Sequence, residues 1–289
     1  MTNGVSGLIH EAFVLERGGD SRIRGDVRVL NAEGASVERR PVIVLLHGFK
    51  GFKDWGSFPY AAERLAGHGF AVVTFNFSHN GVGETDFDEL DKFALNTHTL
   101  ELGDIETVLK AVREGGLPLS EQLDAGRIVL VGHSRGGGDC VLYAAEHEAE
   151  LRGIVSWNGI ADCDLFDDEF RDLVLEDGVG YVPNARTKQE MPISAAFFKD
   201  LDQNEERYDI VARAAALKTP ALFLQGDSDS PRLVYGFEEL QENAPQHRYV
   251  VLEGANHTFG AVHPWAGTTD DLERVIALTA DFAAEVTKG

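Results

Sequence analysis

The chain has 289 residues, 43% of them hydrophobic, which is enough to bury one large core. Acidic residues outnumber basic ones by 48 to 26, giving a formal charge of −22, and this excludes nucleic-acid binding, which needs a basic surface. No apolar run approaches the roughly 18 residues that span a bilayer, and residues 1–7 lack the basic and apolar regions of a secretory signal. We therefore expect a cytoplasmic, single-domain protein without nucleic-acid or membrane partners.

The acidic surface suggests a hypothesis about salt. Only eight of the 26 basic residues are lysines, and an acidic, lysine-poor surface is typical of proteins from a salty cytoplasm, where salt screens self-repulsion. The alternative is an acidic protein with no such adaptation. The halophilic hypothesis predicts that the thermal unfolding midpoint rises between low and molar salt, and a flat or falling midpoint would contradict it.

The hydrophobic pattern predicts strands and helices that alternate along the chain. Residues 7–16 and 21–30 mix apolar and polar residues around the turn-forming segment 17–20, which indicates an antiparallel hairpin. Short apolar runs, typical of parallel strands buried on both faces, then follow at 41–46, 70–75, 128–131, 151–156, 221–224 and 249–252. Helix-like segments lie between or after them at 58–68, 97–114, 137–148, 231–243 and 269–288. This alternation predicts an α/β fold with a doubly wound, mostly parallel sheet.

One stretch breaks the alternation. Residues 161–208 carry clustered acids and then apolar residues with no clear strand–helix pattern. A long insertion in a compact domain is usually a lid or a binding element, and disorder is the alternative. We predict one domain over residues 1–289, with 161–208 as a lid or cap insertion.

Residues 132–136 read Gly-His-Ser-Arg-Gly, a Gly-x-Ser-x-Gly pattern between an apolar strand and a helix-like segment. A strand that turns sharply into a helix holds its central residue in a strained conformation, and the flanking glycines remove side chains that would clash. The helix N-terminus also stabilises negative charge. Ser134 is therefore the predicted nucleophile, although the pattern by itself also fits a simple tight turn.

A serine nucleophile needs an imidazole base, which a carboxylate must orient. Asp229 and His257 follow successive buried strands and complete the chain order Ser, Asp, His. Since parallel strands place their carboxyl ends at one edge, the three loops should open on the same crevice. Asp227 is the alternative acid, but it lies nearer the strand end and is expected to shape the turn.

The negatively charged intermediate of acyl transfer needs two converging backbone donors. The N–H of Arg135, directly after the nucleophile, is one candidate. The other is the N–H of Phe49, next to Gly48 in the loop that follows the first buried strand. We expect His47 and His133 to have structural roles, and the Arg135 side chain either to be solvated or to meet an anionic substrate.

Aromatic and apolar residues near the strand ends and in the insertion are candidates for lining a substrate pocket. These substrate-binding candidates, each of which could equally belong to the core, are Trp157, Tyr181, Met191, Phe197 and Phe198.

Together, His47-Gly48, the segment 132–136, Gly226-Asp-Ser-Asp229 and Gly254-Ala-Asn-His257 resemble the α/β-hydrolase superfamily over nearly the whole chain. The segments 47–54 and 75–83, with Phe87, are similar to the branch of dienelactone-hydrolase-like and cinnamoyl or feruloyl esterases. The resemblance implies the α/β-hydrolase fold with an eight-stranded, mostly parallel sheet, an acyl-enzyme mechanism, and no metal or organic cofactor. The chain departs from the branch at His79, where glycine is common, and Ser134 disfavours the dienelactone hydrolases proper, which use cysteine.

The predicted function is hydrolysis of small-molecule carboxylic esters by a Ser134–His257–Asp229 triad. A peptidase, thioesterase or acyltransferase on the same triad is the first alternative, because only the leaving group or the acceptor differs. A ligand-binding protein without catalysis is the second. The sequence leaves the oligomeric state open.

Overall fold

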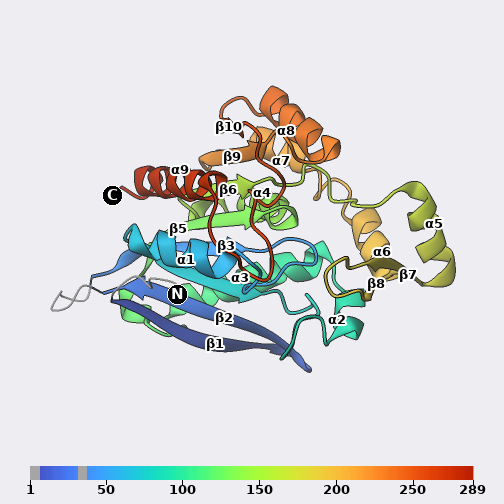
Figure 1. The fold of residues 1–289 in the computed structure, drawn as a ribbon, viewed down its shortest axis with the longest axis horizontal. Coiled ribbons are helices and arrows are strands. Elements are labelled where there is room, and N and C mark those ends of the chain that lie inside the picture. Colours follow the sequence, from blue (N-terminus) through green and yellow to red (C-terminus); the bar gives the residue numbers. More distant parts are fainter. Residues whose placement is uncertain (1–6, 32–37, 289) are drawn as a thin grey trace.

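The computed structural model describes residues 7–31 and 38–288, and an eight-stranded sheet forms its centre (Figure 1). The strands of this sheet, in chain order, are β1 (Leu8–Gly18), β2 (Ser21–Leu30), β3 (Arg40–Leu46), β4 (Ala71–Asn76), β5 (Leu123–His133), β6 (Gly153–Trp157), β9 (Ala221–Gly226) and β10 (Arg248–Leu252). Their spatial order is β1-β2-β4-β3-β5-β6-β9-β10. The pairs β1–β2 and β2–β4 are antiparallel and all the others are parallel, so the predicted mostly parallel sheet and N-terminal hairpin are confirmed.

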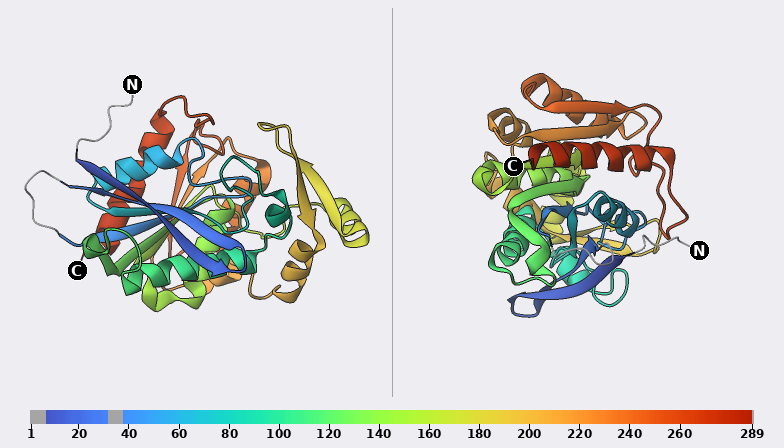
Figure 2. Two further views of the ribbon diagram at one scale, coloured as in Figure 1. Left: turned by 90° about the horizontal axis from the view of Figure 1, so that it is seen from below. Right: turned by 90° about the vertical axis from the view of Figure 1, so that its left-hand side faces the viewer.

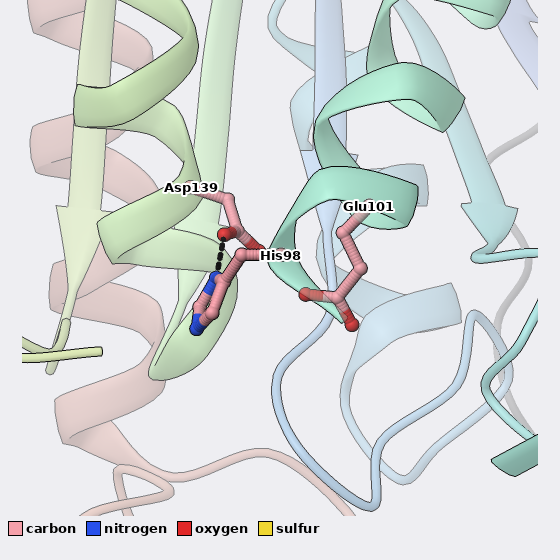
Figure 3. A group of neighbouring side chains, drawn as sticks. All are labelled: His98, Glu101 and Asp139. Atoms are coloured by element: carbon pink, nitrogen blue, oxygen red, sulfur yellow. Dashed lines mark hydrogen bonds and ion pairs between the residues drawn. The ribbon is translucent and has the colours of Figure 1, made fainter. Parts of the chain in front are cut away.

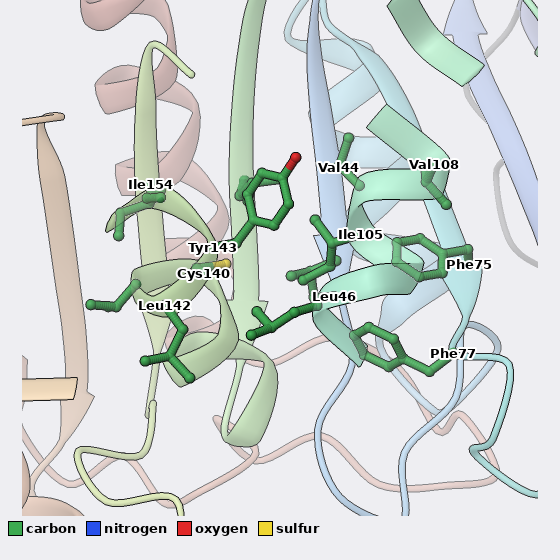
Figure 4. Close-up of a cluster of buried hydrophobic side chains, with 14 of the residues drawn as sticks. Val44, Leu46, Phe75, Phe77, Ile105, Val108, Cys140, Leu142, Tyr143 and Ile154 are labelled. Carbon is green, nitrogen blue, oxygen red and sulfur yellow. The ribbon is translucent and has the colours of Figure 1, made fainter. Parts of the chain in front are cut away.

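Helices cover both faces of this sheet (Figures 1 and 2). The helices outside the predicted insertion are α1 (Phe58–Gly67), α2 (Leu90–Ala94), α3 (His98–Glu114), α4 (Arg135–Glu146), α7 (Ile210–Ala216), α8 (Pro231–Asn243) and α9 (Asp270–Val286), with short 3₁₀ turns η1 (Ser120–Gln122) and η2 (Glu148–Glu150). Apolar residues of α1 and α9 pack in one cluster against one face. Those of α3, α4 and α8 pack in a second cluster on the other face, part of which is shown in Figure 4.

The helices begin and end where local chemistry dictates. The Thr97 hydroxyl accepts a hydrogen bond from Leu100 N–H at the start of α3, and Gly115, with φ of 72°, ends that helix in the left-handed conformation. Leu102, Ile105 and Val112 recur at helical spacing and are buried against the sheet, as their pattern predicted.

The insertion of residues 161–208 has regular structure that its sequence pattern did not reveal. It contains α5 (Asp168–Asp177), an antiparallel hairpin of β7 (Val179–Pro183) and β8 (Glu190–Ser194), and α6 (Ala195–Gln203). Figures 1 and 2 show these elements projecting beyond one end of the large sheet.

None of the helices within residues 7–31 and 38–288 has the length and apolar character required to cross a membrane. Both cysteines, Cys140 and Cys163, are buried and free.

Candidate active site

Ser134 occupies a strained turn between β5 and α4, with φ of 57° and ψ of −120°. The turn is so tight that a Cβ on Gly132 would overlap the carbonyl of Gly136. A Cβ on Gly136 would lie 2.6 Å from the carbonyl oxygen of His47 in the neighbouring loop. Glycine is therefore sterically required on both sides of the serine, which accounts for the Gly-x-Ser-x-Gly pattern.

The loops after β9 and β10 bring Asp229 and His257 together. The Nδ1 of His257 lies 2.8 Å from Oδ2 of Asp229, whose side chain is only 2% exposed. Burial alone would raise the pKa of Asp229, but hydrogen bonds from His257 and the Ser230 N–H, together with the His257 charge, outweigh it and lower that pKa. Asp229 is thus held as a carboxylate that fixes Nδ1 of His257 as the protonated nitrogen, leaving Nε2 free to act as a base.

Asp227 has a different place, as the sequence predicted. Its Oδ1 accepts a hydrogen bond of 2.7 Å from the N–H of Gly254, so it joins the two loops at their turns. Among the described residues it makes no ion pair with a histidine.

Ser134 and His257 line the same cavity, which has a volume of about 480 Å³. In the part of the chain that the structure describes, no hydrogen bond joins the Ser134 hydroxyl to the imidazole. Such bonds are often long in unliganded hydrolases and tighten when substrate binds. The two side chains are therefore placed to act on one bound molecule.

The two predicted backbone donors lie beside the serine. Arg135 is the first residue of α4, where a helical N–H has no acceptor within the helix. The N–H of Phe49 likewise has no backbone acceptor among the described residues. Gly48 packs directly on the turn, because a Cβ there would lie 2.8 Å from Cβ of Ser134 and 3.3 Å from the Arg135 nitrogen. Two unpaired N–H groups next to a nucleophile are what an oxyanion hole requires.

If the chain hydrolyses esters, as its sequence predicts, we expect Gly48→Ala to lower kcat by about 10²–10³-fold, the usual cost of losing one oxyanion donor. The added methyl would push the loop that carries Phe49 away from Ser134. Steady-state kinetics would check this, with Gly67→Ala as the control because a Cβ at that helix position meets nothing within 4 Å. Equal kinetics in the two variants would contradict the role of this loop.

Asn158 is a residue of the candidate site that the sequence pattern did not reveal. This fully buried side chain follows β6, and its backbone has φ of 46°. Its Oδ1 accepts a hydrogen bond of 2.7 Å from Gly226 N–H, and its Nδ2 donates at 2.8 Å to the carbonyl of His257. Asn158 therefore ties the acid loop to the histidine loop. A polar residue directly after a buried strand and before a glycine was the available signal.

His47 is buried and His133 is half-buried, and loss of contact with water lowers their pKa values to about 4 and about 3. His47 donates from Nδ1 to the Gly48 carbonyl at 3.0 Å, which is the structural role the sequence predicted. The ring of His133 packs against the ring of His257, with centroids 4.7 Å apart, and its Nε2 donates to the His257 carbonyl at 2.7 Å. His133 thus holds the candidate base in place through ring packing and a hydrogen bond to its backbone carbonyl.

The Arg135 side chain is neither solvated nor aimed at the cavity, contrary to both sequence-based expectations. It is 2% exposed and its Nε lies 2.7 Å from Oε2 of Glu101 on α3. Its guanidinium also lies 5.4 Å from the centre of the Phe197 ring on α6. The side chain of Arg135 is therefore anchored inside the protein, where Glu101 supplies the opposite charge and the Phe197 ring supplies contact area for the guanidinium.

Glu101 belongs to a buried group with His98 and Asp139 (Figure 3), in which His98 Nδ1 lies 2.8 Å from Asp139 Oδ1. Burial raises the pKa of Glu101 to about 7 and that of Asp139 to about 6. The three side chains have the atom types and spacing that could hold a metal ion. The Arg135 guanidinium supplies a positive charge at this place through its ion pair with Glu101. Among the described residues, His98 Nε2, Asp139 Oδ2 and Arg135 Nη2 have no hydrogen-bond partner.

Burial lowers the pKa of His98 to about 3, so the folded chain binds this proton less readily than the unfolded chain does. Unfolding free energy should therefore fall as the pH falls from about 6.5 towards 3, by up to about 1.4 kcal/mol per pH unit for this group. We expect His98→Asn to lose less stability over this range than the wild type in urea unfolding experiments. His68→Asn, at an exposed position, is the control, and an unchanged slope in His98→Asn would contradict the assignment.

The five substrate-pocket candidates lie outside the two cavities that Ser134 borders. Trp157 is in the core, where its Nε1 donates to Thr279 at 2.9 Å, since an indole N–H needs a partner when buried. Met191, Phe197 and Phe198 are at most 2% exposed and pack with the second cluster, whereas Tyr181 is 57% exposed on the hairpin. The cavity walls instead come from residues after β6 and in α8, such as Ile160, Leu165 and Leu233.

Comparisons with known proteins agree with this architecture. The model of the alpha/beta hydrolase fold family matches residues 41–178. No curated protein sequence matches the chain. Among solved structures, Est1E from Butyrivibrio proteoclasticus with bound ferulic acid is 16% identical, with a TM-score of 0.67 over 95% of this chain and 98% of that one. A dienelactone hydrolase from Anabaena variabilis is 16% identical, with a TM-score of 0.62 over 96% and 98%. DcsB in complex with its substrate analogue is 16% identical, with a TM-score of 0.71 over 96% and 99%.

These similar structures include a dienelactone hydrolase and Est1E, in line with the branch that the motifs suggested. At these identities the likeness establishes the fold. The predicted resemblance is confirmed, and the chain has the α/β-hydrolase fold.

Proposed function

We propose that this protein is a serine hydrolase that cleaves carboxylic esters through an acyl-enzyme intermediate. The observation that carries the proposal is the 2.8 Å bond between His257 and the buried Asp229, in loops that share a cavity with Ser134 in its strained turn. A histidine with only a structural role would not need this arrangement. Its partner is a buried carboxylate at the wall of a cavity, and the same cavity holds a serine beside the unpaired N–H groups of Phe49 and Arg135.

In the proposed reaction, Nε2 of His257 accepts the proton of the Ser134 hydroxyl while the Ser134 oxygen attacks the carbonyl carbon of the ester. The N–H groups of Phe49 and Arg135 donate to the oxyanion that forms, and Asp229 stabilises the imidazolium. The imidazolium then protonates the leaving alcohol. A water molecule, deprotonated by the same histidine, then attacks the acyl carbon. The bond from this carbon to the Ser134 oxygen breaks, the imidazolium returns its proton to that oxygen, and the acid is released.

We also propose that residues 161–208 act as a cap on a single catalytic domain. Three residues at the start of this segment, Ala161, Asp162 and Leu165, line the 480 Å³ cavity. The hairpin reaches the candidate oxyanion loop directly, because the Lys50 ammonium donates to the Pro183 carbonyl at 3.2 Å.

The substrate of this proposal is a small ester with an apolar part. A volume of about 480 Å³ lies within the range of about 300–1,000 Å³ that small-molecule sites commonly have. Ferulic acid, which Est1E binds, is an aromatic acid of a size that this cavity accommodates.

Covalent labelling tests the proposal. A fluorophosphonate should add once per chain, forming a bond between phosphorus and the Ser134 oxygen with loss of fluoride and a proton, and peptide mass spectrometry would locate it. Prior incubation with a hydrolysable p-nitrophenyl ester should slow the labelling. Labelling at another serine, or none, together with no turnover of esters, would refute an ester hydrolase and favour a binding role.

A further inference from the structure

The first turn of α4 carries the N–H of Arg135, the candidate oxyanion donor, and this turn is built almost without side chains. Residues 136–138 are three consecutive glycines, so within residues 135–139 only Arg135 and Asp139 have a side chain. Glycine is the poorest helix former after proline, because it loses the most backbone freedom when a helix forms. The start of α4 is therefore weak as a helix and depends on contacts with its surroundings.

The glycines cannot be exchanged for better helix formers, because the turn lies directly on a neighbouring loop. A Cβ on Gly137 would lie 2.8 Å from Cα of Gly159, and a Cβ on Gly138 would lie 2.6 Å from Cγ1 of Ile160. Both distances are shorter than real Cβ atoms tolerate. The two side chains that flank the glycines are thus the ones placed to compensate for the weak turn.

Both flanking side chains reach α3. The Nε of Arg135 lies 2.7 Å from Oε2 of Glu101, and Oδ1 of Asp139 lies 2.8 Å from Nδ1 of His98 (Figure 3). All four side chains are at most 4% exposed. His98 and Glu101 are three positions apart on α3, and Arg135 and Asp139 are four apart on α4, so each pair lies on one face of its helix. Two buried contacts therefore join the helices, one at each end of the glycine run.

The contact at Arg135 is held on two sides. Asn96 Nδ2 donates to the other carboxylate oxygen of Glu101 at 2.7 Å, which fixes the carboxylate in place. The Phe197 ring lies 5.4 Å from the Arg135 guanidinium. Polar contacts are strong where water is excluded, so a shift of the Arg135 backbone would strain a firm anchor.

We propose that these two contacts, Arg135 with Glu101 and Asp139 with His98, form a clamp that keeps the N–H of Arg135 aligned with the oxyanion. Glu101 and His98 are positioning residues in this arrangement, since neither lines the cavities that Ser134 borders. The inference rests on the proposed ester hydrolysis and gives a buried polar group a part in that reaction.

Arg135→Met tests the clamp. Methionine keeps apolar contact with Phe197 and retains the backbone N–H, but it has no guanidinium. We expect kcat for p-nitrophenyl esters to fall by at least about tenfold with KM within about twofold, because the oxyanion forms only after substrate has bound. Inhibition by a trifluoromethyl ketone, whose adduct with Ser134 carries a negative oxygen, should weaken by a similar factor.

Arg17→Met is the matched control. The Nε of Arg17 lies 2.6 Å from Oδ1 of Asp104, another buried carboxylate of α3, but this ion pair joins α3 to β1 and not to α4. Arg17→Met should lower the thermal unfolding midpoint, as Arg135→Met does, and leave kcat within about twofold of the wild type. Equal effects of the two variants on kcat, whether large or small, would overturn the proposal.

A second variant keeps the test decisive even if Arg135→Met fails to fold. Glu101→Gln preserves the shape of the side chain and an oxygen for Arg135, but it removes the charge and so weakens the contact. Burial raises the pKa of Glu101 to about 7, so assays at about pH 8.5 compare the ionised carboxylate with the amide. We expect kcat to fall by at least about threefold at unchanged KM, and an unchanged kcat would overturn the proposal.

The two substitutions should not add. Once Arg135→Met has removed the guanidinium, Glu101→Gln should cause no further loss of kcat, because Glu101 acts through Arg135. Independent losses would contradict the clamp. Absence of any ester turnover by the wild type would refute the proposed function itself, whereas turnover that these variants leave unchanged would overturn the clamp alone.

Discussion

Ser134→Ala is expected to lower kcat for p-nitrophenyl esters by about 10⁶-fold, the usual cost of losing the nucleophile of a serine hydrolase. The hydroxyl is the only part lost, and alanine carries the same strained backbone, with φ of 57°, that serine does. The fold should therefore persist, which circular dichroism and thermal unfolding would check alongside the kinetics.

The matched control for this substitution is Ser228→Ala. Ser228 is an exposed serine of the loop that carries Asp229, and it should leave kcat nearly unchanged. His257→Ala should cost about as much as Ser134→Ala, and the double variant no more than either, because the two groups act as a unit. Additive losses would mean that they act in separate steps, contrary to the proposed mechanism.

Asp229→Asn is expected to lower kcat by about 10⁴-fold with little change in KM. The amide fits the same space but has no negative charge, so it neither holds His257 in the correct tautomer nor stabilises the imidazolium. Asp229 makes this contact at 2.8 Å with a side chain that is almost fully buried, so water does not replace the lost carboxylate.

Asp227→Asn provides the comparison two residues away. The oxygen of an asparagine can still accept the hydrogen bond from Gly254 N–H, so kcat should stay within about threefold of the wild type. A large loss in Asp227→Asn with a small loss in Asp229→Asn would reverse the assignment of the acid.

The strands and helices of the main domain were predictable because their hydrophobic runs and end signals are local. The range 21–30 coincides with β2 and 231–243 with α8, where Pro231 begins the helix. The hairpin β7–β8 could not be read this way. Its apolar residues pack against those of α5 and α6, and the clustered acids around them hide any period.

The same distinction applies to the site. Ser134, Asp229 and His257 were visible because each follows a buried strand, and parallel strands bring their ends together. The burial of the Arg135 side chain was not visible in the sequence, because it depends on Glu101 and Phe197, which are distant from Arg135 in the chain. Phe197 and Phe198 could not be assigned to core or pocket from composition, since both environments select the same apolar rings.

Asn158 has a consequence for recombination with other proteins of this fold. One face of its amide holds the loop at Gly226 and the other holds the loop at His257. A chimera that imports only one of these loops would leave half of a buried amide unpaired and shift the imported side chain relative to its partner. Crossovers that keep both loops together with Asn158 belong before β6 or after residue 257, so residues 153–257 form an exchangeable block that carries Asp229 and His257 together.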